Sequence, residues 1–409
     1  MKPKVLTIVA VVALVGSACS SPASTPSGSA SGGTTAVKIG VELPLSGGEA
    51  PNGGPTLKGI QLAIKQIQVP GYTVTLNTQD DAVNGVNNPD QGARNITTLV
   101  SDKAVFAVVG PFNSAVAKAE IPISNEAGLL QCSPANTNST LTLGDTAKQL
   151  RQAHPDKIAY VRVVANDDYQ GLADATIAYK DLSKKAMYIV DDQTTYGKYL
   201  ADVVEAQFKK LGGTVVKHDG AGTNVSDYTS LLTAAQALNP DVVFYGGVTS
   251  TGGGVLRKQM VANGMGALPF IGGDGISDGA ASVPSSFLNI AGDQGDIGTW
   301  MTVAGAHDIP DRATLATAYK TEFNAELGAY SAAAYACTQV YLQALQAVGP
   351  DREKIRAYVT TTTNSFTTVL GKIGFDANGD INQHIISYFQ FDPTTKDWKF
   401  VRQNDPTAA

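Results

Sequence analysis

Short apolar segments alternate with segments of helical periodicity along most of the chain, and this alternation limits the possible folds more than any other feature. A first series begins at residue 37, and a polar break at 166–171 separates it from a second series that ends near 271. Strands that alternate with helices form parallel sheets with helices on both faces. The sequence therefore predicts an α/β protein with two lobes. The main expected strands are 37–43, 72–78, 106–109, 128–132, 186–190, 214–217, 241–245 and 269–271, and a segment around 160–165 leads to the polar break. The main expected helices are 56–67, 89–100, 171–182, 228–238, 255–263, 315–327 and 331–348.

Two polar turns follow neighbouring strands of the first series. The segment 110–114 follows the strand 106–109 and places Ser114 at a helix start, while the segment 133–137 follows the strand 128–132. Unpaired N–H groups and the positive dipole end make a helix start favourable for an anion. Both turns leave the same sheet edge, where open α/β sheets bind ligands, so we expect a small carboxylate there. Ser114 is equally suited to an ordinary N-cap, and 133–137 to an ordinary turn.

The N-terminus has the pattern of an export signal. Lys2 and Lys4 precede an apolar run at 5–15, and small residues lead to Cys19. The run is too short to span a membrane, which takes about 20 residues, so we interpret 1–18 as a signal peptide. The arrangement resembles a bacterial lipobox with lipid-modified Cys19, although Gly16 stands where Leu is usual. Residues 19–36, rich in Ser, Thr, Pro and Gly, are expected to form a flexible tether.

The charge of the mature chain argues against nucleic acid as a partner. Removal of Lys2 and Lys4 with the signal lowers the basic residues from 30 to 28 against 36 acidic residues, which gives a net charge of −8. Cys132 and Cys337 remain, without metal-binding spacing; they are either two buried thiols or a disulfide. No sequence motif indicates a cofactor, and we expect none, nor a metal.

Short motifs in a fixed order carry a family resemblance. They are Leu43-Pro44-Leu45-Ser46-Gly47, Asp80-Asp81, Gly110 to Ser114, Ser133-Pro134-Ala135, Asp168-Tyr169-Gln170-Gly171, Tyr196-Gly197, Tyr245-Gly246-Gly247, and Gly371 to Asp376 followed by Gly379-Asp380. Together they resemble type I periplasmic substrate-binding proteins of ABC importers, in particular the leucine/isoleucine/valine-binding proteins. The resemblance implies two Rossmann-like lobes with parallel sheets joined by a three-strand hinge. Lobe 1 would comprise 37–164 plus 304–382, and lobe 2 would comprise 165–303 plus 383–409.

The resemblance also implies seven ligand-binding residues. Ser114 and Thr137 would hold the carboxylate of an amino acid with their side chains. Asn113 and Ala135 would add backbone groups to the same end of the ligand. Asp274 would hold the ammonium, and Tyr196 and Tyr330 would line the cleft. Val248 and Asn52 stand where branched-chain amino-acid binders have Tyr. These departures leave room for another small amino acid, an amide or an aromatic acid.

The resemblance implies a monomeric extracytoplasmic lipoprotein, not an enzyme, that delivers a small amino acid or related carboxylate to an ABC permease. One alternative is a sensor that reports ligand occupancy to a membrane receptor. Another is an α/β hydrolase, because residues 275–279 match Gly-x-Ser-x-Gly. The hydrolase is disfavoured because residues 272–276 separate the expected strand from Ser277. Only His307 and His384 follow, neither in a recognisable catalytic setting.

Overall fold

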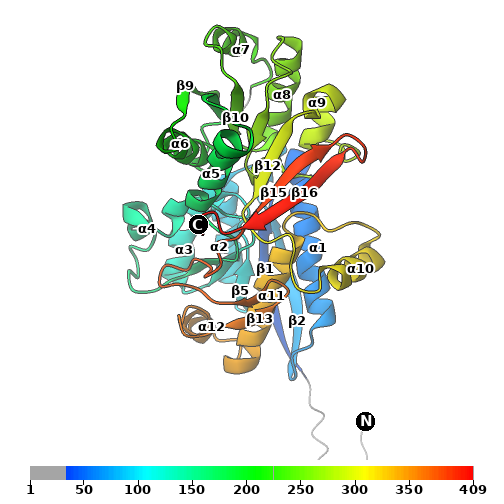
Figure 1. Ribbon diagram of the computed structural model, residues 1–409. Helices are drawn as coiled ribbons and strands as arrows, with labels where there is room; N and C mark the ends of the chain where they lie inside the picture. The colour runs from blue at the N-terminus through cyan, green and yellow to red at the C-terminus, as the bar shows by residue number, and fades with distance from the viewer. Residues whose placement is uncertain (1–33, 224, 409) are drawn as a thin grey trace, which may run out of the picture. The chain divides into compact units, whose positions relative to one another are not determined.

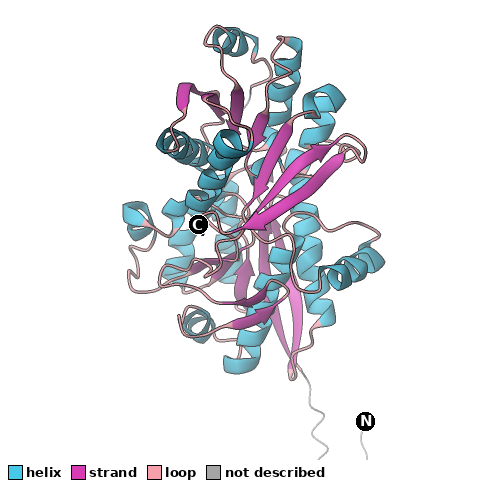
Figure 2. Cartoon of the chain, in the orientation of Figure 1, coloured by secondary structure: helices cyan, strands magenta, loops and turns pink. Residues whose placement is uncertain are grey.

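The computed structural model describes residues 34–223 and 225–408 and contains two large sheets (Figures 1 and 2). The first sheet is entirely parallel, in the order β2-β1-β5-β6-β7. Its strands are β1 (Thr35–Leu43), β2 (Tyr72–Asp80), β5 (Val105–Val109), β6 (Gln131–Ser133) and β7 (Tyr160–Arg162). This is a doubly wound order, and the chain changes direction across the sheet between β1 and β5.

The second sheet repeats the doubly wound order as β9-β8-β10-β11-β12 and then continues into β15 and β16. The added strands form an antiparallel hairpin, drawn in red in Figure 1, and β15 pairs with β12. The predicted parallel sheets are thus confirmed, and the hairpin is an addition to them. The strands are β8 (Ala186–Asp191), β9 (Thr214–Gly220), β10 (Val242–Gly246), β11 (Phe270–Gly272), β12 (Thr299–Val303), β15 (Ile386–Asp392) and β16 (Asp397–Asn404). Two minor pairs are β3 (Ala82–Val83) with β4 (Val86–Asn87), and β13 (Phe366–Thr368) with β14 (Gly371–Ile373).

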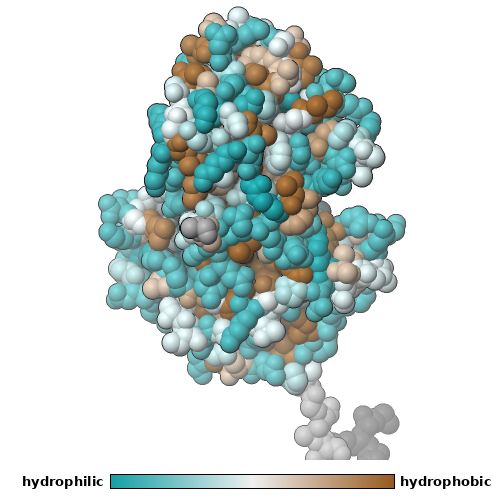
Figure 3. Space-filling model, in the orientation of Figure 1, coloured by the Kyte–Doolittle hydropathy of each residue, from teal (hydrophilic) through white to brown (hydrophobic). Residues whose placement is uncertain are grey.

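Helices lie on both faces of the sheets (Figure 2), and among the described residues none is long and apolar enough to cross a membrane. The face seen in Figure 3 carries mostly hydrophilic residues, with apolar ones in small groups. The helices are α1 (Ala50–Gln66), α2 (Pro89–Ser101), α3 (Ser114–Ala127), α4 (Gly144–Leu150), α5 (Asp167–Thr176), α6 (Thr195–Lys210), α7 (Thr229–Gln236), α8 (Gly253–Ala262), α9 (Phe287–Asp296), α10 (Arg312–Phe323), α11 (Ser331–Val348) and α12 (Arg352–Val359).

Several predicted boundaries are wrong, among them the two nearest the N-terminus. The first helix was expected at 56–67, but α1 begins at Ala50. Pro51 lies in its first turn, where the missing N–H costs no helical hydrogen bond. A Cβ at Gly53 would come within 1.8 Å of the Pro44 carbonyl oxygen, so this glycine allows close helix packing. The tether was expected to extend to residue 36, but Thr35 and Ala36 already pair with β2.

The chain passes three times between the two sheets. It leaves the first sheet after β7, returns after β12, and leaves again after β14 to form β15. The return segment contains α11, where the Tyr341 hydroxyl lies 2.9 Å from the Val108 carbonyl oxygen in β5. A disulfide between Cys132 in β6 and Cys337 in α11 also joins this helix to the first sheet. The pairing left open by the sequence is therefore decided in favour of the disulfide. The predicted signal peptide, Cys19 and the tether up to residue 33 lie outside the described residues.

Candidate functional site

A small cavity of about 30 Å³ lies where loops from the carboxyl ends of both sheets meet. All seven predicted ligand-binding residues line this cavity, although they are spread over more than half of the chain. The lining consists of Phe112, Asn113, Ser114, Ala135, Thr137, Tyr196, Val248, Asp274, Gly275 and Tyr330. The structure therefore brings the predicted residues together, and it adds Phe112, Val248 and Gly275 to them.

Residues that follow β5 and β6 form one wall of the cavity. Ser114 begins α3 and is 2% exposed, with Asn113 in extended conformation before it. Thr137 is 1% exposed. The first N–H groups of a helix have no partner within the helix, and the helix dipole places positive potential on them. Two hydroxyls beside a helix start form a wall suited to an anion such as a carboxylate.

Hydrogen bonds hold these two loops to each other. The Ser133 hydroxyl donates to the Pro111 carbonyl oxygen at 2.7 Å and accepts from the Asn136 N–H at 2.8 Å. The Asn136 side-chain amide donates to the Phe112 carbonyl oxygen at 2.6 Å. Because both loops are tied at their bases, Ser114 and Thr137 have little freedom relative to each other. These bonds within the protein therefore organise the wall.

The opposite wall contains the only carboxyl group among the lining residues, that of Asp274. Asp274 follows β11 and is 3% exposed. The Tyr196 hydroxyl, in the first turn of α6, donates to Asp274 Oδ1 at 2.7 Å and accepts from the Gly275 N–H at 3.1 Å. Burial raises the pKa of Asp274 to about 6, and the hydrogen bond from Tyr196 opposes this rise. At neutral pH this wall carries a buried negative charge, which an ammonium group would neutralise.

Tyr330 connects the two walls. It directly precedes α11, which packs on the first sheet, and its hydroxyl donates to the Asp274 carbonyl oxygen at 3.0 Å. Its ring packs edge-on against Phe112, with 4.7 Å between centroids. Similar bonds join the lobes nearby, because the Asn138 side-chain amide donates to the Thr195 carbonyl oxygen at 2.5 Å. The structure therefore shows the lobes in contact around the cavity.

The cavity is too small for an amino acid in this arrangement. A volume of about 30 Å³ holds one or two water molecules. Tyr196 and Tyr330 occupy the space in front of Asp274, since both hydroxyls bond to that residue. A ligand enters only if these tyrosines move or if the two walls separate. Both routes break the Tyr330 bond between the lobes.

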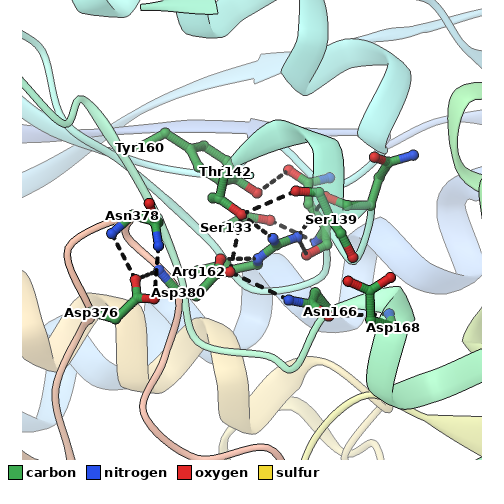
Figure 4. Close-up of polar contacts among 12 residues, drawn as sticks. Ser133, Ser139, Thr142, Tyr160, Arg162, Asn166, Asp168, Asp376, Asn378 and Asp380 are labelled. Atoms are coloured by element: carbon green, nitrogen blue, oxygen red, sulfur yellow. Dashed lines mark hydrogen bonds and ion pairs between the residues drawn. The ribbon is translucent and has the colours of Figure 1, made fainter. Parts of the chain in front are cut away.

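A buried arginine that we did not predict as part of the site supports the loop that follows β6, and Figure 4 shows its contacts with Thr142 and Asp380. Arg162 at the end of β7 is fully buried; its Nε lies 2.6 Å from Asp380 Oδ1, and its Nη1 donates to the Asn138 carbonyl oxygen at 2.9 Å. Nη2 donates to the Thr142 hydroxyl. The sequence signal was a single charged residue within the apolar run 159–165. Arg162 thus links two of the three crossings, since Asp380 lies between β14 and β15.

Two residues that the sequence analysis named, Ser277 and Asn52, do not line the small cavity. Ser277 follows the short 3-10 helix Asp274–Ile276 and not a strand, so the residues 275–279 do not form a nucleophile elbow. Asn52, which was considered for the amine subsite, lines a separate and larger cavity. In the described part of the chain, no group of three or more His, Cys, Asp or Glu side chains is placed to hold a metal ion.

Both the sequence and the fold are similar to those of known proteins. A family model described as periplasmic binding protein matches residues 36–396. A Leu/Ile/Val-binding protein homolog of Brucella abortus (strain 2308) is 30% identical over 359 residues, which cover 86% of this chain and 90% of that protein. The crystal structure of a leucine-binding protein from Thermotoga maritima has a TM-score of 0.76 and 26% identity and covers 90% of this chain and 99% of that one. A solute-binding protein of an ABC transporter from R. palustris, in complex with 4-hydroxybenzoate, has a TM-score of 0.76 at 18% identity and covers 90% and 97%, a likeness of fold alone.

Proposed function

The chain belongs to the periplasmic binding protein family, and we propose that it captures a small amino acid between its two lobes and delivers it to an ABC permease. The observation that carries this proposal is the pairing of a wall suited to an anion, at Ser114 and Thr137, with Asp274, which has the only carboxyl group among the residues that line the cavity. An α-amino acid presents the complementary pair of charges. The family is one of binding proteins, and the chain is not an enzyme.

In this proposal each wall binds one end of the ligand. The Ser114 and Thr137 hydroxyls and backbone groups at Asn113 and Ala135 would hold the carboxylate. Asp274 would hold the ammonium, and Tyr196 and Tyr330 would turn from Asp274 toward the ligand. The Leu/Ile/Val-binding names of relatives support an amino acid as ligand.

A small carboxylate without an amine is the second candidate. Val248 supports it, because an apolar side chain lines the cavity beside Asp274 and adds no hydrogen-bond acceptor for an ammonium. The sensor alternative uses the same site and differs only in the partner that reads the closed form.

Lobe boundaries and attachment to the membrane belong to the same proposal. We assign 37–164 plus 304–382 to lobe 1 and 165–303 plus 383–409 to lobe 2. The strands support this division. The chain passes from one sheet to the other directly after β7 and again after β12, and it makes the third passage directly before β15. Cleavage after residue 18 and lipidation of Cys19 would anchor a monomer on the extracytoplasmic face of the membrane. One acyl chain anchors only weakly, so multiple acylation of Cys19 is part of this proposal.

The test combines ligand identification with calorimetry. Mass spectrometry of the ligand released from purified, denatured protein gives its identity, and calorimetry then compares Ser114→Ala, Thr137→Ala and Asp274→Ala. Loss of one hydroxyl that binds a charged group costs about 1.5 to 3 kcal/mol, or roughly one to two decades of affinity. Loss of Asp274 leaves a buried cation unpaired and costs about 3 to 5 kcal/mol.

The ranking of the variants decides the ligand class. An α-amino acid is supported if Asp274→Ala is the most damaging of the three. Near-normal binding by Asp274→Ala together with failure of Ser114→Ala would show an acid without an amine. Thr97→Ala in α2 and Asp202→Ala in α6 change exposed side chains outside the cavity and are matched controls, which should leave the affinity unchanged.

A further inference from the structure

Glu49 is a buried acid that the proposed ligand contacts do not use. It ends the 3-10 helix Gly47–Glu49, which follows β1 of the first sheet, and it is 1% exposed. Its Oε1 accepts hydrogen bonds from the Ser250 hydroxyl and, at 3.3 Å, from the Asn87 side-chain amide. Ser250 lies in the 3-10 helix Thr249–Thr251, which follows β10 of the second sheet. The bond between Ser250 and Glu49 therefore joins the two lobes.

The loop that carries Glu49 is fixed to its own lobe. The Gly48 N–H donates to the Gly85 carbonyl oxygen at 3.0 Å, in the turn between β3 and β4. Asn87, which bonds to Glu49, belongs to β4. A Cβ at Gly47 would lie 2.1 Å from the Gly85 Cα, so glycine permits this close approach. The Glu49 carboxyl group is therefore held in place from the side of the first sheet.

The opposing loop is also fixed, and it supplies part of the wall of the small cavity. Asp192 Oδ2 accepts from the Thr251 hydroxyl at 2.8 Å and from the Val248 N–H at 3.3 Å. Val248 lines the small cavity and lies on the same loop as Ser250. The separation of the lobes breaks the bond between Ser250 and Glu49, because each partner stays with its own lobe.

Contact between the lobes disfavours the charged form of Glu49. Burial raises the pKa of Glu49 above its ordinary value of 4.5, hydrogen bonds from Ser250 and Asn87 oppose the rise, and the charge of Asp192 adds to it. When the lobes separate, Asp192 moves away and water reaches the carboxyl group. The pKa of Glu49 then returns toward its ordinary value.

Three further titratable groups interact with Glu49, and none of them is basic. The charge of Glu49 raises the pKa of Asp278 in lobe 2, of Asp81 after β2 in lobe 1, and of the Tyr330 hydroxyl, which is neutral at pH 7. Asp278 and Asp192 both come from the opposite lobe, so closure brings two more acids toward Glu49. An acid that becomes buried beside other acids takes up a proton.

We propose that Glu49 is a proton-linked latch, whose carboxyl group takes up a proton from water as the lobes close and bonds to Ser250 in the closed form. The inference rests on the proposed function, because closure around a ligand brings the two residues together. Glu49 does not line the small cavity, so it is a positioning residue that acts on affinity through closure. Its contribution to affinity is complete below pH 4.5, the ordinary pKa, and is lost as pH rises above that value.

The test compares the wild type with Glu49→Gln by calorimetry at pH 5 and pH 8, with L-leucine and benzoate as probes. The Gln side chain keeps an oxygen that accepts from Ser250 but cannot ionise, so it imitates the protonated latch. The ratio of the wild-type Kd to the variant Kd should rise at least threefold from pH 5 to pH 8. Asp274 titrates in both proteins, so its effect cancels in this ratio. At pH 6, measurements in two buffers of different ionisation enthalpy should show more proton uptake on binding by the wild type than by the variant.

Three more variants serve as controls. Glu126→Gln makes the same change at an exposed position of α3 and should match the wild type at both pH values. Asn138→Ala removes an uncharged bond between the lobes and should weaken binding by the same factor at both pH values. Ser250→Ala should weaken binding more at pH 8 than at pH 5, because the bond from Ser250 favours the carboxylate.

The outcomes separate the latch from the proposed function. If L-leucine binds and the ratio is the same at both pH values, the latch is refuted and the proposed function stands. Binding of benzoate alone refutes the amino-acid assignment, and the same ratio measured with benzoate then decides the latch. Absence of binding by both probes at about 10 mM, a concentration that detects even millimolar affinity, overturns both proposals. If Glu49→Gln does not fold, equal losses for Ser250→Ala at the two pH values refute the latch.

Discussion

Replacing Asp274 by Asn should stabilise the ligand-free protein even though it removes the proposed ammonium partner. Burial raises the pKa of Asp274 from its ordinary value near 4 to about 6. Each tenfold change in proton affinity corresponds to about 1.4 kcal/mol, so ionisation of this side chain costs the folded state about 3 kcal/mol at neutral pH. An Asn side chain has no charge to bury, and its oxygen still accepts the hydrogen bond from Tyr196.

The sign of the pH dependence follows from the raised pKa. Between pH 4 and 6 the folded protein keeps the proton on Asp274, whereas the unfolded chain releases it. The contribution of this group therefore becomes less favourable as pH rises through that window, and the loss is complete above pH 6. Asp274→Asn should exceed the wild type in unfolding free energy by about 2 to 3 kcal/mol at pH 7.5 and by less than about 0.5 kcal/mol at pH 4.

Urea unfolding at both pH values, followed by tryptophan fluorescence, measures this difference. Asp202→Asn on the exposed surface of α6 is the control, and it should change the free energy of unfolding by less than about 0.5 kcal/mol. If Asp274→Asn is less stable than the wild type at pH 7.5, the buried carboxylate stabilises the fold and the reasoning is wrong. A gain of equal size at both pH values would also refute it, because the gain could not then arise from ionisation.

Three further predictions concern other parts of the chain. The cavity of about 30 Å³ behind Tyr330 is too small for the ligand, so ligand entry requires the two lobes to separate. Small-angle scattering should then show a smaller radius of gyration after addition of the co-purified ligand, and equal radii would reject closure. Replacing both Cys132 and Cys337 by Ala removes the disulfide between two residues 205 positions apart, which gives the unfolded chain more conformational freedom. The free energy of unfolding in urea titrations should fall by about 3 to 5 kcal/mol, and an unchanged midpoint would contradict this. Cys19→Ala should abolish fatty-acid labelling and release the protein from membranes, and persistent labelling would exclude Cys19 as the anchor.

Most of the fold was predictable, because the strands in the two sheets are short apolar runs between helices. The strand β12 was missed, since its sequence contains polar residues that are nevertheless buried. Thr302 is fully buried because its hydroxyl donates to Asp174 Oδ1 at 2.8 Å and accepts from the side chain of Gln170. A hydroxyl that is satisfied by partners from a distant helix cannot be recognised from local hydrophobicity. The hairpin of β15 and β16 was missed as a pair, and only one final strand was expected.

The order of the sequence motifs, through the family resemblance, predicted that the site residues lie close together. It did not predict that the cavity between them is closed. Ser114, Thr137 and Asp274 each follow a strand, so their placement at sheet edges follows from the topology. The bonds from Tyr196 and Tyr330 to Asp274 depend on how the lobes meet, which no local pattern encodes.

The threefold passage between the sheets has a consequence for biogenesis. The first sheet lacks its covering helix α11 until residue 348 is available, and the second sheet lacks β15 and β16 until residue 404. If the chain is exported N-terminus first, as the predicted signal peptide implies, neither lobe is complete until these late segments have emerged. Apolar surface on β5 and β6 thus stays uncovered for most of the transit, which exposes the emerging chain to aggregation and proteolysis. We therefore expect both lobes to finish folding only after residue 404 has become available.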